Sequence, residues 1–178
     1  MANEPTEAFE LRELSPDDKC RGFFLGNDPG DEVYLPLTIF LQKSAKLFHT
    51  QNAAKTYVFV KGNKATAYIT LSCSQIILDK PPDGLDTYRY KEYPAIKIGK
   101  LAVDKHYRDS DLGSQLVSLA VAIVTEKVMP HVGCRFLIVD SHKSAVGFYR
   151  KRGFSLLETE ENKASDNPLM FLDVGKLA

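Results

Sequence analysis

The chain has 178 residues, of which 23 are Lys or Arg and 23 are Asp or Glu, so its formal net charge is zero. This length and an ordinary globular composition predict one compact domain over residues 1–178. The even charge balance excludes a global field that would attract nucleic acid, although a local basic patch stays open.

The N-terminal residues have neither the basic segment nor the apolar core of a signal peptide, and no apolar run approaches the ~20 residues that span a bilayer. Three cysteines, Cys20, Cys73 and Cys134, form no CxxC pair, which is typical of reduced thiols. The histidines lack the spacing of metal ligands. We therefore expect a cytoplasmic protein with no membrane contact and no metal.

The first elements are a strand and a helix separated by an ambiguous segment. Residues 9–14 alternate apolar and polar side chains, which predicts a half-buried strand. Residues 15–18 have the serine, proline and acids of a helix N-terminus, but the glycines after them leave a short helix and a loop both open. Apolar spacing then predicts a helix at residues 37–48.

A hairpin and a third strand follow in the middle of the chain. β-branched and aromatic side chains at residues 56–60 and 65–77 predict two strands joined by a turn at Gly62-Asn63. The Pro-Pro-Asp-Gly cluster at residues 81–84 ends the second strand. Residues 95–103 predict the next strand, and the order so far indicates a sheet with helical connections.

The last third alternates helices and strands. A helix is predicted from Leu112 to just before Pro130, followed by an apolar strand at residues 135–139. A short helix at residues 143–152 ends where Gly153 is expected to act as a C-cap. Two final strands are predicted around a polar loop, at residues 154–157 and 170–174. Together these elements predict a mixed α/β sheet.

The segment most informative about function is residues 101–114, which place a tight polar loop between a strand and a helix. Unpaired N–H groups and the positive end of the helix dipole make such a position a natural phosphate site. Gly113 would let the backbone approach a phosphate without a Cβ atom in the way. From these residues alone, a phosphate loop and a purely structural turn are equally open.

Two motifs, in this order, resemble the GCN5-related N-acetyltransferase (GNAT) family. The phosphate loop of that family, Arg/Gln-x-x-Gly-x-Gly/Ala after a strand ending in Leu-Ala-Val, is matched by Leu101, Ala102, Val103, Arg108, Leu112 and Gly113. Its later signature, Ala-x-x-Phe-Tyr-x-x-x-Gly-Phe, is matched by Ala145, Phe148, Tyr149, Gly153 and Phe154. The matching core covers residues 95–157.

The resemblance implies a single α/β (α+β) domain with a mixed, mostly antiparallel twisted sheet flanked by helices. It implies that an acetyl group moves from acetyl-coenzyme A to a primary amine by direct attack in a ternary complex. It assigns Tyr149 as the acid for the leaving thiolate. It assigns cofactor contacts to Leu101, Ala102, Val103, Arg108, Asp109, Ser110, Asp111, Leu112, Gly113 and Ser114.

Residues 93–104, with the strand at residues 56–60 before them, look like the branch that includes toxins of toxin–antitoxin pairs. Those toxins acetylate the amino group of aminoacyl-tRNA, which makes tRNA a candidate acceptor and a homodimer a candidate assembly. A basic cluster at Lys143 and residues 150–152 is either an RNA contact or a solvated helix face, and the solvated face is the simpler interpretation.

The loop departs from the family pattern at Asp109 and Asp111, where toxin loops have glycine. Each aspartate brings a carboxylate toward the phosphates of the cofactor, a like-charge contact that disfavours binding. The alternative function is therefore a non-catalytic acyl-coenzyme A-binding or protein-interaction module with a degenerate phosphate loop. Glu92 is a candidate general base, although its position in a loop favours a solvated residue.

Overall fold

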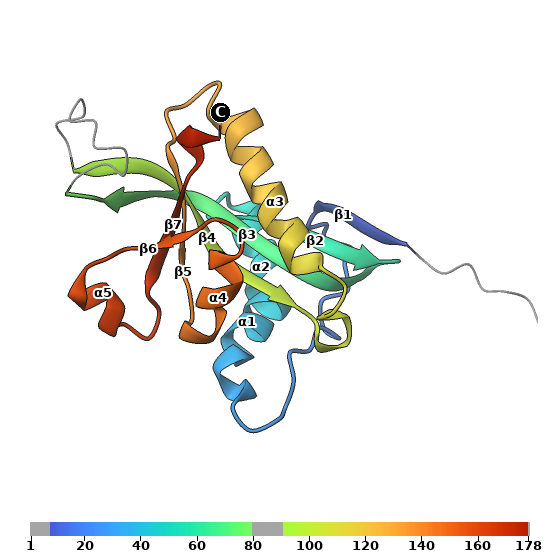
Figure 1. The fold of residues 1–178 in the computed structure, drawn as a ribbon. Coiled ribbons are helices and arrows are strands. Elements are labelled where there is room, and N and C mark those ends of the chain that lie inside the picture. The colour runs from blue at the N-terminus through green and yellow to red at the C-terminus, as the bar shows by residue number, and fades with distance from the viewer. Residues whose placement is uncertain (1–7, 80–90, 178) are drawn as a thin grey trace, which may run out of the picture. The chain divides into compact units, whose positions relative to one another are not determined.

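The structure, a computed structural model, describes residues 8–79 and 91–177 (Figure 1). In these residues, hydrogen bonds join seven strands in the order β1-β2-β3-β4-β5-β7-β6. The β4–β5 pair is parallel, whereas β1–β2, β5–β7 and β6–β7 are antiparallel. The mixed, mostly antiparallel sheet that the motifs imply is therefore confirmed.

The chain divides into two compact units. The first contains the described residues up to Thr70 together with Lys100–Leu116, and the second contains those of Leu71–Gly99 and Val117–Ala178. Strands β3 (Lys64–Ile77) and β4 (Glu92–Val103) contribute residues to both. Each unit is described below by itself.

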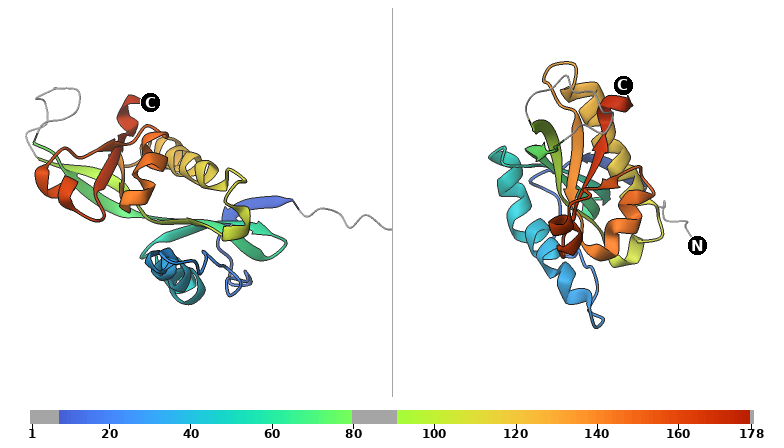
Figure 2. Two further views of the ribbon diagram at one scale, coloured as in Figure 1. Left: turned by 60° about the horizontal axis from the view of Figure 1, so that its bottom comes forward. Right: turned by 60° about the vertical axis from the view of Figure 1, so that its left-hand side comes forward.

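The first unit is built on β1 (Phe9–Glu13), β2 (Lys55–Lys61) and the start of β3. Gly62 adopts a φ of 62° in the β2–β3 turn, the left-handed conformation that glycine accepts without steric cost. One continuous helical segment lies against these strands (Figure 2). It runs through η1 (Asp31–Tyr34), α1 (Leu35–Ile39), the π-helical η2 (Phe40–Ser44) and α2 (Ala45–Thr50).

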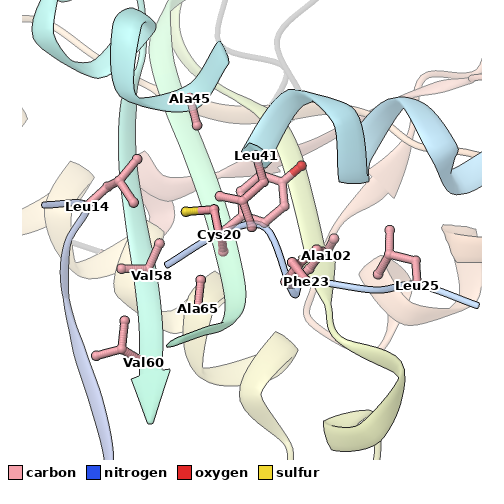
Figure 3. Packing of buried hydrophobic residues seen from close by; sticks show 11 residues of the cluster. Leu14, Cys20, Phe23, Leu25, Leu41, Ala45, Val58, Val60, Ala65 and Ala102 are labelled. Atoms are coloured by element: carbon pink, nitrogen blue, oxygen red, sulfur yellow. The ribbon is translucent and has the colours of Figure 1, made fainter. Parts of the chain in front are cut away.

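Figure 3 shows the core of the first unit, where apolar side chains of the helices pack on those of β2 and β3. Tyr68 and Leu41 are among its largest fully buried side chains. Tyr68 satisfies its hydroxyl by donating to the Leu37 carbonyl at 2.7 Å. Burying a side chain of the size of Leu contributes about 1.5–3 kcal/mol, so this cluster holds helix and sheet together.

The second unit contains the rest of β4 together with β5 (Phe136–Asp140), β6 (Ser155–Leu156) and β7 (Leu169–Asp173). Its core includes Tyr93 and Phe136, whose rings meet edge to face at 5.6 Å. The unit also carries most of α3 (Leu112–Ile123), the π-helical η4 (Val124–Val128), η5 (Lys143–Ala145), α4 (Val146–Arg150), α5 (Glu160–Ala164) and η6 (Val174–Lys176).

The strands and helices expected from the sequence are present, with two differences. At residues 15–18, where a short helix and a loop were both open, the chain forms a loop in which Asp18 accepts from the Ser15 amide and from Arg12. The short helix α5 lies in the expected polar loop, where Thr159 accepts from the Asn162 amide as an N-cap. Strand β4 begins earlier than residue 95. The turn expected at residues 81–84 lies outside the described residues.

Candidate functional site

The end of β4 has an edge that β5 does not use. The β4–β5 ladder runs from the Ala95–Phe136 pair to the Ile98–Val139 pair, whereas β4 itself continues to Val103. Residues 99–103 of β4 therefore carry peptide groups beyond the last pair with β5. Such groups can pair with an extended amide chain, as a peptide does when it adds to a sheet edge.

The loop after β4 is anchored to the segment around Phe24. The buried side chain of Asp104 accepts from the amides of Phe24, at 2.8 Å, and His106, at 3.0 Å. The Lys105 amide donates to the Phe24 carbonyl at 2.8 Å. Arg108 donates through Nη2 to the Leu25 carbonyl. These bonds hold the loop in one arrangement, which preorganises the helix N-terminus that follows it.

Helix α3 begins with backbone donors that have no acceptor. The amides of Asp111, Leu112 and Gly113 bond to none of the described residues. Gly113, between Leu112 and Ser114, contributes no side chain. With the positive end of the dipole of a 12-residue helix behind them, these amides are of the kind that suits an anionic group.

Asp111 occupies the backbone conformation that glycine would favour. Its φ is 55°, in the left-handed region, which Asp and Asn enter more readily than other side chains. Its carboxylate accepts from the Ser114 hydroxyl, and its carbonyl accepts from the Gln115 amide at 3.2 Å. The aspartate therefore tethers the Ser114 side chain while it keeps the loop in a shape normally made with glycine.

The basic side chains of the loop, Lys105 and Arg108, do not pair with its aspartates. Lys105 pairs with Asp28 at 2.6 Å, an ion pair that holds the pKa of Asp28 below its ordinary value. Arg108 is held on the Leu25 carbonyl. Asp109 is exposed and bonds to none of the described residues. The predicted cofactor contacts from Leu101 to Ser114 therefore lie on one strand end and one loop, with two acidic side chains among them.

Tyr149 lies in the second unit, on α4, and only 5% of its surface is exposed. Its ring meets Phe148 at 5.1 Å and Phe154 at 5.3 Å, both edge to face. Gly153, with φ at 85°, makes the turn that brings Phe154 back to it. Burial raises the pKa of Tyr149, and the charge of Arg152 opposes part of that rise. Its hydroxyl bonds to none of the described residues.

The other sequence candidates have ordinary surroundings. Glu92 is exposed on β4. In the basic cluster, Lys143 pairs with Asp166 at 3.1 Å, and Arg152 lies 3.6 Å from the centroid of the Phe148 ring. Burial raises the pKa of the Cys20 and Cys134 thiols, which makes them poor nucleophiles. No group of three or more potential metal ligands occurs within the described parts of the chain.

The chain belongs to the GNAT family of acetyltransferases. The model of the acetyltransferase (GNAT) domain matches residues 52–156, which include both motifs. The chain is thus an enzyme of the acyltransferase class whose donor cosubstrate is acetyl-coenzyme A. None of the helices in the described residues is long and apolar enough to cross a membrane.

Solved structures of two acetyltransferases share this fold. AtaT complexed with acetyl-methionyl-tRNAfMet matches with a TM-score of 0.81 and 21% identity, over 96% of this chain and 97% of that one. A mutant of KacT matches with a TM-score of 0.79 and 23% identity, over 96% and 99% of the two chains. AtaTR bound with acetyl-coenzyme A matches with a TM-score of 0.75 and 22% identity, over 95% of each.

Proposed function

We propose that this protein transfers an acetyl group from acetyl-coenzyme A to a primary amine, and that the amine belongs to an aminoacyl-tRNA. The observation that carries the donor half is the loop between β4 and α3, whose backbone donors suit a diphosphate. The unused edge of β4 suits the amide-bearing arm of coenzyme A. Residues 101–103 would hold that arm and residues 108–114 the phosphates.

Tyr149 serves as the acid in this proposal. Acetyl-coenzyme A supplies a thioester carbonyl as the electrophile, and attack by the neutral amine forms a C–N bond while the C–S bond breaks. The leaving thiolate takes a proton from Tyr149, and the proton that the amine releases restores the phenol. A buried phenol normally has a hydrogen-bond partner, so a hydroxyl without one among the described residues is suited to a ligand. Its raised pKa keeps it protonated at neutral pH. Desolvation also raises the basicity of a leaving thiolate, which narrows the difference in pKa between them.

The acceptor is inferred from likeness to a solved complex. AtaT, which shares this fold, was solved with acetyl-methionyl-tRNAfMet. The even net charge of this chain requires that any RNA contact come from a local basic patch. A homodimer stays a prediction. The sharper alternative is a module that binds the cofactor without turnover, which Asp109 and Asp111 favour.

Calorimetric titration of acetyl-coenzyme A into the wild-type protein tests the donor half. For the acceptor half, an aminoacyl-tRNA is incubated with the protein and acetyl-coenzyme A and then analysed by mass spectrometry. Micromolar binding with acetylation of the amino group supports the proposal. Binding without turnover across a panel of aminoacyl-tRNAs and small amines supports the non-catalytic module. An absence of binding in both the wild type and Asp111→Gly would rule out the donor site.

Replacing Asp111 separates the effect of its charge from that of its conformation. Asp111→Asn keeps a residue that tolerates the left-handed conformation and can still accept from the Ser114 hydroxyl, but removes the negative charge. We expect acetyl-coenzyme A to bind about three- to tenfold more tightly, equivalent to roughly 0.7–1.4 kcal/mol. An unchanged Kd would show that this carboxylate does not face the phosphates.

The matched variant Asp111→Ala tests the conformational role. Alanine disfavours a φ of 55° and has no carboxylate to accept from the Ser114 hydroxyl, so thermal unfolding should show a loss of about 1–2 kcal/mol in stability. Asp111→Gly should lose much less, because glycine accepts this conformation without steric cost.

A further inference from the structure

A cavity of about 560 Å³ opens in the first unit, and none of the predicted cofactor contacts lines it. Its walls come from segments far apart in the sequence: residues 18–22, residues 64–66 at the start of β3, and Gln42 and Lys46 on the helical segment. Asp104, His106 and Tyr107 complete it. Its size is that of a site for a small molecule or for part of a larger one.

Four backbone carbonyls around the cavity are already occupied. Lys46 donates to the carbonyls of Pro16, at 2.5 Å, and Asp18, at 2.8 Å. One helical turn earlier, Gln42 donates to the carbonyls of Arg21 and Phe23, each at 3.1 Å. The loop over residues 16–23 is thus held by its carbonyl oxygens, which leaves few acceptors for a ligand.

The carboxylates of the cavity are occupied as well. The side chain of Asp18 is 1% exposed and accepts from both terminal nitrogens of Arg12, at 2.8 and 2.7 Å, and from the Ser15 amide at 2.7 Å. Asp104 accepts from two backbone amides and lies 2.7 Å from Nδ1 of His106. Neither carboxylate is available to neutralise the remaining basic side chains.

Three of those basic side chains are exposed and bond to none of the described residues: Lys19, Arg21 and Lys64. The backbone holds the two lysines together, because Lys19 and Lys64 form a β-bridge. In that bridge the Lys19 amide donates to Asn63 at 2.7 Å, and the Lys19 carbonyl accepts from Ala65 at 3.1 Å. Two like charges held side by side, with no carboxylate between them, repel each other unless an anion joins them.

We propose that this cavity binds phosphate groups of the RNA backbone, an inference that rests on the aminoacyl-tRNA acceptor proposed above. Its vacant groups are donors and cations, which suit phosphate oxygens. Lys and Arg on long stems at a solvent-exposed rim suit a backbone that carries a charge at every nucleotide. The cluster at Lys143 and residues 150–152 fits less well, since ion pairing occupies Lys143 and Arg152 lies against Phe148.

The test measures the affinity for fluorescein-labelled deacylated tRNA by anisotropy, at several salt concentrations. The cavity variant combines Lys19→Gln, Arg21→Gln and Lys64→Gln. A matched control, Lys43→Gln with Lys127→Gln and Lys176→Gln, removes the same charge from exposed lysines that do not line the cavity. We expect the cavity variant to bind about tenfold or more weakly, with a slope of log K against log salt smaller by about one for each phosphate that is no longer neutralised. The control should stay close to wild type.

Calorimetry with acetyl-coenzyme A on the same proteins separates the two proposals. Unchanged donor binding in the cavity variant, with weakened tRNA binding, supports the cavity as an RNA site. Three outcomes would overturn the cavity proposal alone, provided that the wild type binds acetyl-coenzyme A. They are an equal loss of tRNA affinity in both triple variants, no loss of tRNA affinity in the cavity variant, and no binding of tRNA to the wild type. A wild-type protein that does not bind acetyl-coenzyme A would instead refute the proposed function.

Discussion

Tyr149→Phe is expected to lower kcat about 10²- to 10⁴-fold while the Kd for acetyl-coenzyme A changes little. Removing one hydroxyl deletes the proposed acid, and general acid catalysis contributes a factor of that size. The ring stays, so the contacts with Phe148 and Phe154 are kept. Release of free thiol, followed by a colorimetric reagent, measures kcat, and calorimetry measures the Kd.

Tyr57→Phe is the matched control, because it removes the hydroxyl of a half-buried tyrosine that belongs to neither motif in the sequence. Its kcat should equal that of the wild type. Because burial raises the pKa of Tyr149, its hydroxyl should stay protonated up to about pH 10. Deprotonation of Tyr149 should therefore not lower the wild-type kcat below that pH. A Tyr149→Phe enzyme with full activity would remove the residue from the mechanism.

Arg12→Met is expected to destabilise the protein by about 3 kcal/mol at neutral pH. Arg12, on β1, forms a two-pronged ion pair with Asp18, whose side chain is 1% exposed. Breaking a buried pair by removing one partner leaves an uncompensated charge, which costs roughly 3–5 kcal/mol, and the partial exposure of Arg12 favours the lower end. Chemical denaturation of both proteins measures the difference.

Two variants test the cause of that loss. Glu10→Gln removes the other carboxylate near Arg12, 3.6 Å away and largely exposed, and should cost less than about 1 kcal/mol. Adding Asp18→Asn to Arg12→Met removes the stranded charge and should recover part of the stability. If Arg12→Met costs no more than Glu10→Gln, the ion pair does not stabilise the fold.

The same pair makes stability depend on acid pH. Burial by itself would raise the pKa of Asp18, but the bonds from Arg12 and the Ser15 amide outweigh it and hold this pKa below its ordinary value. A carboxyl whose pKa is lowered on folding stabilises the protein above its unfolded pKa of about 3.9. That stabilisation is lost as pH falls through the folded pKa. The difference between wild type and Arg12→Met should therefore shrink in acid.

Local patterns in the sequence predicted most of the secondary structure and the fold class. Alternation identified β1, β-branched and aromatic residues around the Gly62-Asn63 turn identified the β2–β3 hairpin, and Gly153 was expected where a left-handed residue closes the α4 turn. These features follow from side-chain periodicity and from the conformational freedom of single residues. Helix α5 was missed because a five-residue helix is too short to show an apolar period, although its Thr159 cap was a usable signal.

Tertiary structure alone decided the rest. The sequence marked Asp111 as a departure from glycine, but only the fold shows that it adopts a φ of 55° and accepts from the Ser114 hydroxyl. The side chains of Lys105 and Arg108 bond to Asp28 and to the Leu25 carbonyl, contacts that no local sequence pattern reveals. The bridge between Lys19 and Lys64 joins two residues that are far apart in the sequence, so the basic cavity exists only after folding. Periodicity records which face of an element is buried, whereas charge pairing depends on which elements meet.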